Sequence, residues 1–137
     1  QEINIGMTAD VGTLQRLPKI IPEGVARELA YTGRRMTAQR AMEVGLVNEV
    51  FSSHEVMVDA VLDIAAEIAT KSPLAIWGTK ESINYTRDHS VADSLNFIAT
   101  WQAGMYQPKD MANVFEAQSN REEPEFDDLP PARKGLG

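Results

Sequence analysis

The stretch TAQRAMEVGLVNEVF, residues 37–51, contains both kinds of regular structure that the sequence predicts. Thr37 is a favoured N-cap residue, and helical sequence follows it to Val44, where Gly45 is a typical helix end. The next six residues, LVNEVF at 46–51, alternate apolar and polar side chains, which predicts a short strand. A helix that leads into a strand predicts an α/β fold class.

Helical spacing of apolar side chains extends to both sides of this stretch. The pattern S-S-H-E at 52–55 is typical of a capping box and predicts the longest helix, which runs to about Thr70. Pro18 is expected to tighten or break the first helix near its end. The other predicted helices cover residues 11–21, 22–31, 73–87, 91–106 and 110–120.

Charge and composition exclude several functional classes. The chain has 137 residues and a net charge of −7, from 13 basic and 20 acidic residues, which argues against binding to a nucleic-acid backbone. It has no cysteine, which excludes disulfides, thiolate metal sites and cysteine nucleophiles. No apolar run approaches the roughly 20 residues of a membrane span. We therefore expect an intracellular protein with no membrane and no nucleic-acid partner.

The carboxylates of Glu2 and Asp10 lie eight positions apart and bracket a turn before the first predicted helix. Two acids on either side of a turn can face one cavity, where one accepts a proton while the other donates one. That is the minimum equipment for isomerising or hydrating a polarised double bond. Spacing alone is a weak signal, because the chain has 20 acidic residues and most acids are solvated.

Three longer strings identify a family. EINIGMTADVGTLQRLPK at 2–19, YTGRRMTAQRAMEVGLVNEVF at 31–51 and KSPLAIWGTK at 71–80 resemble the enoyl-CoA hydratase/isomerase (crotonase) superfamily. In that superfamily an acid opens an E-x-x-x-G pattern and a T-Q-R-L helix follows. The chain starts with Gln1 in the middle of this motif, so we expect it to be the back end of a larger fold.

The resemblance implies a domain organisation. Residues 1–51 are expected to form the C-terminal part of a crotonase-like ββα spiral, and residues 52–120 a helical trimerisation region. Residues 121–137, with the acidic run REEPEFDD followed by prolines and glycines, are expected to be a solvated tail. The implied partners are an acyl-CoA substrate and further copies of the chain, in a homotrimer or a hexamer of two trimers.

Two strings point to one branch of the superfamily. Most hydratases have Gly-Ala-Gly-Gly or a similar run where this chain has Ala9-Asp10-Val11-Gly12. That acid, together with TRDHSVADSLNF at 86–97, resembles the Δ3,5-Δ2,4-dienoyl-CoA isomerases. The resemblance implies that Glu2 is the general acid/base near the acyl α-carbon and that Asp10 is the branch-specific acid. It implies a 1,5 proton shift that converts 3,5-dienoyl-CoA to 2,4-dienoyl-CoA.

The resemblance carries further expectations about the site. Burial against an acyl chain is expected to raise the pKa of both acids. Tyr106 and Phe115 are candidates for contact with CoA or the acyl tail, whereas His54 is expected to be exposed and His89 to orient a loop. The oxyanion-hole donors and a third acid are expected upstream of Gln1. No metal is implied, and no cofactor beyond the CoA that is part of the substrate.

Other functions remain open at this point. An enoyl-CoA hydratase or a Δ3-Δ2 enoyl-CoA isomerase would use Glu2 as its main acid. A non-catalytic scaffold or an RNA-binding member of the superfamily is less favoured, because both acids are present and the net charge is negative. The implied location is the cytoplasm in a bacterium, and the mitochondrion or peroxisome in a eukaryote.

Overall fold

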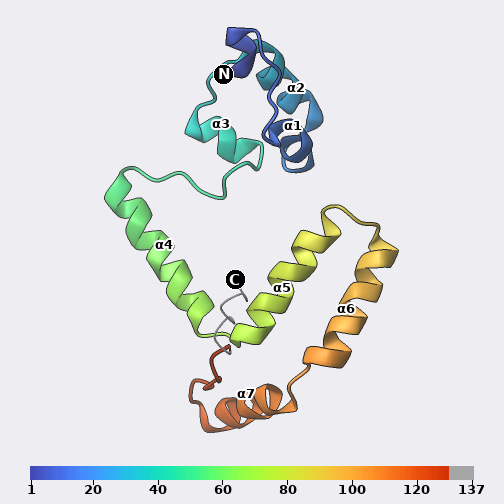
Figure 1. Cartoon of the computed structure of the whole chain (residues 1–137). Coiled ribbons are helices and arrows are strands. Elements are labelled where there is room, and N and C mark those ends of the chain that lie inside the picture. Colours follow the sequence, from blue (N-terminus) through green and yellow to red (C-terminus); the bar gives the residue numbers. More distant parts are fainter. Residues whose placement is uncertain (130–137) are drawn as a thin grey trace, which may run out of the picture. The chain divides into compact units, whose positions relative to one another are not determined.

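The computed structural model describes residues 1–129, and these are built from helices and the connections between them (Figure 1). They divide into two units, one from Gln1 to Asp59 and one that begins at Ala60. The division falls within helix α4, His54–Ala69, which therefore contributes to both units.

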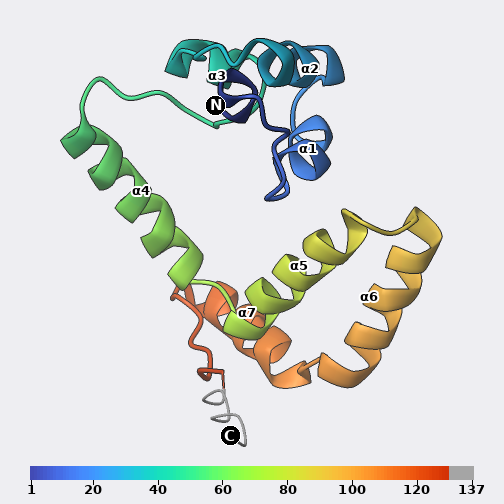
Figure 2. The same cartoon turned by 45° about the horizontal axis from the view of Figure 1, so that its top comes forward.

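The first unit holds five short helical elements. They are η1 Glu2–Ile5, α1 Thr13–Arg16, η2 Leu17–Lys19, α2 Glu23–Thr32 and α3 Ala38–Glu43. Helix α2 contacts both η1 and η2, and α1 contacts η2 (Figure 2). The core of this unit is small and consists of Ile21, Ala26 and Ala41, each less than a tenth exposed.

The predicted helix over 11–21 forms only in part. The α-helical segment ends at Arg16, and the chain continues as the 3-10 helix η2. Pro18 has no backbone N–H to donate to the carbonyl four residues earlier, so an α-helix cannot continue with full hydrogen bonding. The amides of Ile20 and Ile21 both donate to the carbonyl oxygen of Leu17, at 3.0 and 3.1 Å, which gives the tighter turn.

The strand predicted for 46–51 is wrong. The amides of Leu46 and Val47 donate back to the Ala41 carbonyl oxygen, at 2.8 and 3.4 Å, so the segment begins as a turn that closes α3. A strand needs a neighbouring strand to receive its backbone hydrogen bonds, and residues 1–129 contain none. The α/β class is therefore not realised within the described residues, which are helical.

Serine and threonine caps confirm most of the predicted helix starts. The hydroxyl of Thr37 accepts from the Arg40 amide at 3.2 Å and caps α3. The hydroxyls of Ser72 and Ser90 cap α5, Pro73–Thr86, and α6, Val91–Met105, in the same way. For α4 the cap is Ser53 rather than Ser52, because the Val56 amide donates to the Ser53 hydroxyl at 3.3 Å.

In the second unit α5 and α6 form an antiparallel hairpin, which Figure 1 shows side by side. Gly78 on α5 is buried, and a Cβ placed there would lie 2.5 Å from Trp101 Nε1 on α6. Trp101 also meets the edge of Trp77, with ring centroids 4.9 Å apart. The missing side chain at Gly78 therefore lets the two helices approach closely, and the indole rings fill the space beside it.

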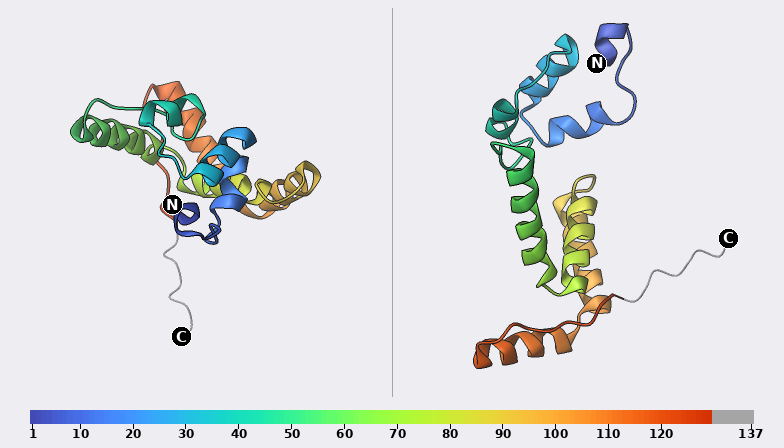
Figure 3. Two further views of the ribbon diagram at one scale, coloured as in Figure 1. Left: turned by 90° about the horizontal axis from the view of Figure 1, so that it is seen from above. Right: turned by 90° about the vertical axis from the view of Figure 1, so that its left-hand side faces the viewer.

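The segment after α7, Pro108–Asn120, follows the helix backwards (Figure 3). The Asn113 side chain donates to the Glu125 carbonyl oxygen at 2.9 Å, and Lys109 Nζ pairs with Asp127 at 2.6 Å. Residues 122–129 contain neither helix nor strand, and their acidic side chains are exposed as expected, but their backbone is attached to α7. The rest of the predicted tail, residues 130–137, lies outside the described part.

Gly33 ends α2 and controls how η1 meets it. Its φ of 61° is left-handed, a conformation that favours glycine. A Cβ at this position would lie 2.5 Å from the Asn4 side chain, whose Nδ2 is 3.5 Å from the Gly33 carbonyl oxygen. The absent side chain therefore makes room for Asn4, and η1 carries Glu2 next to α2.

We expect Gly33→Ala to destabilise the protein more than Gly45→Ala does. Both residues have positive φ, so an alanine at either costs about 1–2 kcal/mol in backbone strain. Only at Gly33 does the added methyl meet Asn4, whose exposed side chain must rotate away and give up its hydrogen bond to the Gly33 carbonyl oxygen, a further loss of about 0.5–1.5 kcal/mol. Urea unfolding of the two variants measures the difference. Equal losses of stability would contradict the tight contact between Asn4 and Gly33.

Candidate active site

A pocket of about 400 Å³ opens beside Glu2 in the first unit. Its walls are mainly apolar, and Glu2 is the only carboxylate among the described residues that line it. We call it the Glu2 pocket. It is lined by Gln1, Glu2, Ile3, Met7, Thr8, Ala9, Thr13, Leu14, Leu17, Leu29, Ala30, Tyr31, Gly33, Arg34, Met36 and Leu46. An apolar cavity with few polar groups is the usual form of a small-molecule site.

A tight turn fixes the position of Glu2. Glu2 is the first residue of η1, and its carbonyl oxygen accepts from the Met7 amide at 2.9 Å. Gly6 closes the turn with a φ of 76°. The Glu2 side chain is 41% exposed, and its Oε2 lies 3.2 Å from the Gln1 amino nitrogen. The carboxylate is thus held by local backbone geometry but remains open to solvent.

The expected rise in the pKa of Glu2 applies to a carboxylate covered by an acyl chain, so it stays a prediction. Without substrate, the backbone N–H of Glu2 interacts with the carboxylate and holds its pKa below the ordinary value. Desolvation, the effect behind the expected rise, is weak at a side chain that is 41% exposed.

Asp10 lies in the exposed loop between η1 and α1. It is absent from the described residues that line the Glu2 pocket, although its neighbour Ala9 lines that pocket. The structure therefore brings Glu2 into the cavity and leaves Asp10 one residue beyond its wall. That both acids act on one substrate stays a prediction.

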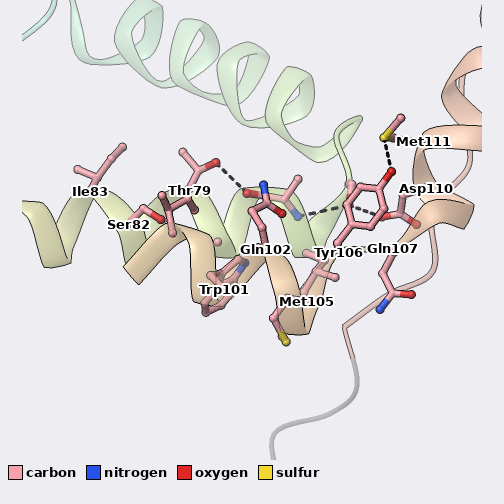
Figure 4. A pocket seen from close by; sticks show the side chains of 15 residues that line it. Thr79, Ser82, Ile83, Trp101, Gln102, Met105, Tyr106, Gln107, Asp110 and Met111 are labelled. Atoms are coloured by element: carbon pink, nitrogen blue, oxygen red, sulfur yellow. Dashed lines mark hydrogen bonds between the residues drawn. The ribbon is translucent and has the colours of Figure 1, made fainter. Parts of the chain in front are cut away.

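Tyr106 lines a separate cavity of about 480 Å³ in the second unit, where α5, α6 and α7 meet (Figure 4). Its hydroxyl donates to Met111 Sδ at 2.8 Å, and nearby the Ser72 hydroxyl donates to Asp110 at 2.5 Å. Phe115 lies on α7, is 60% exposed, and does not line this cavity. The contact of Tyr106 and Phe115 with CoA or an acyl tail stays a prediction.

The two histidines have the structural roles expected of them. His54 is the exposed first residue of α4. His89 has its Nδ1 2.7 Å from the Tyr85 carbonyl oxygen, and its ring stacks on Tyr85 with centroids 3.7 Å apart. His89 thus fixes the connection that follows α5.

Sequence reasoning missed part of the pocket lining. Met7, Met36 and Leu46 lie outside helices, so helical periodicity gave no signal for them. Leu14 and Leu17 did have a signal, since they belong to the apolar face predicted for 11–21.

Within residues 1–129 no three side chains are grouped as metal ligands, and no helix has the length and apolarity needed to cross a membrane.

Comparison with known proteins identifies the family. The Enoyl-CoA hydratase/isomerase family profile matches residues 1–129. The mitochondrial Δ3,5-Δ2,4-dienoyl-CoA isomerase of Homo sapiens is 48% identical over 124 residues, which are 90% of this chain and 38% of that protein. The peroxisomal isomerase of the same name from Arabidopsis thaliana is 40% identical over 126 residues, 92% of this chain and 45% of that protein.

The fold comparison agrees with the sequence comparison. The crystal structure of an enoyl-CoA hydratase from Mycobacterium tuberculosis matches with a TM-score of 0.82 and 32% identity, over 92% of this chain and 50% of that one. The chain thus spans less than half the length of the two curated relatives and half the length of this structure. Sequence and backbone together show that the chain belongs to the enoyl-CoA hydratase/isomerase family, with a crotonase-like fold.

Proposed function

We propose that the protein isomerises 3,5-dienoyl-CoA to 2,4-dienoyl-CoA. The observation that carries this proposal is a carboxylate, Glu2, in an apolar pocket, followed eight residues later by a second acid, Asp10. Two relatives that align over nine-tenths of this chain are named for that isomerisation.

The proposed reaction needs two proton transfers at opposite ends of a diene. The thioester acidifies the C2 hydrogen, and Glu2 removes it to leave a conjugated dienolate. Asp10, which enters this step in its protonated form, then donates its proton to C6 and gives the 2,4-diene. Loss of the C2 proton from Glu2 to solvent and uptake of a solvent proton by Asp10 restore both acids. Two fixed carboxylates suit this geometry, because a single one would have to move along the substrate.

Substrate binding would adjust the basicity of Glu2. The lowered pKa of the free carboxylate favours its ionised form, which is the form that accepts a proton. An acyl chain against the apolar wall would displace water from the half-exposed side chain and raise its pKa, which strengthens it as a base. The same burial would move the pKa of Glu2 towards the operating pH, where general bases are most effective.

The dienolate oxygen also needs hydrogen-bond donors, which are often the largest single contribution to catalysis. We propose that these donors, and a third acid, belong to the part of the family fold that residues 1–137 do not cover. The human relative is more than twice as long as the aligned region, which leaves room for them in a protein of that size.

Subunit contacts are part of the proposal. The side chains of Val61, Leu62, Ile64 and Ile68 on α4 are each about half exposed, which is unusual for such large apolar groups. Further copies of the chain, in a trimer or a hexamer, would cover them.

The compartment of the human and Arabidopsis relatives supports a mitochondrial or peroxisomal location if the source is a eukaryote, and we propose the cytoplasm if it is a bacterium.

Asp10→Asn in the full-length protein is expected to lower turnover of a 3,5-dienoyl-CoA by about 10²–10⁴-fold, the usual contribution of a general acid. Asn keeps the size of the side chain but has no acidic proton to give. Asp63→Asn, on the exposed face of α4, is the matched control and should leave turnover unchanged. Stopped-flow absorbance of the conjugated product measures both. A fully active Asp10→Asn variant would remove Asp10 from the mechanism.

The second candidate function is hydration of an enoyl-CoA, which the similarity to the Mycobacterium tuberculosis hydratase favours. We expect crotonyl-CoA to be hydrated much more slowly than a 3,5-dienoyl-CoA is isomerised, because the acid at Asp10 is the feature that resembles the dienoyl-CoA isomerases rather than the hydratases. Loss of the conjugated enoyl absorbance measures hydration. Hydration faster than isomerisation would favour the hydratase.

A further inference from the structure

The Glu2 pocket has a neighbour in the same unit. A second cavity of about 230 Å³, which we call the α2 pocket, is lined by Leu14, Leu17, Pro18, Glu23, Ala26, Arg27, Ala30 and Tyr31. Four residues line both cavities: Leu14, Leu17, Ala30 and Tyr31. These four side chains therefore form a partition between two spaces, and only one of the spaces contains the candidate acid.

Hydrogen bonds hold the α2 side of the partition. Arg27 Nη1 donates to the Tyr31 hydroxyl at 2.9 Å, and Arg27 Nε donates to Glu23 at 2.8 Å. Glu23, Arg27 and Tyr31 lie on successive turns of α2, so these hydrogen bonds hold the Tyr31 ring in place along its own helix. Leu14 comes from the other side, on α1, and is 37% exposed.

The chemistry of the walls indicates an alkyl chain as the occupant. A polypeptide segment would bring one N–H and one C=O group per residue, each of which needs a partner when buried. The partition offers three apolar side chains and one phenol whose hydroxyl is already bonded to Arg27. The two charged residues of the α2 pocket, Glu23 and Arg27, are bonded to each other. An alkyl chain needs no hydrogen bonds, and each buried methylene stabilises binding by about 0.8 kcal/mol.

We propose that Leu14 and Tyr31 set the acyl-chain length that the protein accepts. Short acyl chains end in the Glu2 pocket, and longer chains must pass the Leu14–Tyr31 partition into the α2 pocket. The proposal rests on the proposed function, since it takes the occupant to be the acyl part of an acyl-CoA. Leu14 and Tyr31, which lie outside the catalytic pair, would then select between short and long substrates.

The test compares binding of hexanoyl-CoA and dodecanoyl-CoA to the full-length protein by calorimetry. Both acyl chains are saturated, so neither can be isomerised, and their affinities do not depend on the catalytic acids. Leu14→Ala and Tyr31→Ala each open the partition. Each should raise the ratio of dodecanoyl-CoA to hexanoyl-CoA affinity by about tenfold, the smallest effect usual for altered fit in an apolar pocket.

Two control variants match these changes. Ile20→Ala removes the same number of carbons as Leu14→Ala from a half-exposed position that lines neither cavity. Ile20→Ala should leave the affinity ratio unchanged. Tyr31→Phe keeps the ring but loses the bond to Arg27, so it should raise the ratio less than Tyr31→Ala does. Circular dichroism checks that all four variants retain the helical content of the unmodified protein.

The outcomes separate this proposal from the proposed function. An unchanged affinity ratio in both opened variants would overturn the role of the partition. Loss of binding for both chain lengths would also overturn it, because Leu14 and Tyr31 would then support the protein and not select the ligand. A shifted ratio in a protein that fails to isomerise any 3,5-dienoyl-CoA would support the partition and reject the isomerase.

Discussion

The close approach of Asn4 to Gly33 is the contact on which the candidate site depends. Gly33 ends α2 in a left-handed conformation, and the space of its missing side chain is occupied by Asn4 of η1. The same short η1 carries Glu2 at its first position, and Gly33 itself lines the Glu2 pocket. The residue that ends α2 thus also makes room for the short element that carries the candidate base.

The two acids differ in their surroundings, which suits the different tasks proposed for them. Glu2 lines the pocket, and its own backbone N–H holds its pKa below the ordinary value. Asp10 lies in an exposed loop beyond the pocket wall. Few large side chains are buried anywhere in residues 1–129, where the apolar core consists of Ile21, Ala26, Ala41 and Ala117. A bound acyl chain and further protein surface would both add to a core this small.

The sequence predicted what is decided locally and missed what is decided at a distance. Caps such as Thr37 and Ser90 act within one turn of helix, so their helices were predicted close to their observed bounds. The strand at 46–51 depended on a partner strand that residues 1–129 do not supply. The lowered pKa of Glu2 without substrate comes from its own backbone N–H, a contact in the η1 turn that no sequence pattern indicated. The partition between the two pockets joins α1 to α2, a tertiary contact that no periodicity indicates.

The central claim is that Glu2 and Asp10 act at opposite ends of the diene, and the position of solvent hydrogen in the product tests it most directly. The reaction is run in heavy water with the unmodified protein and with Asp10→Asn, and deuterium is located by NMR. With the unmodified protein, the product should carry deuterium at C6. Asp10→Asn should still exchange the C2 hydrogen of the substrate while almost no C6-labelled product forms. Loss of C2 exchange together with conversion, or full C6 labelling in the variant, would contradict the division of roles.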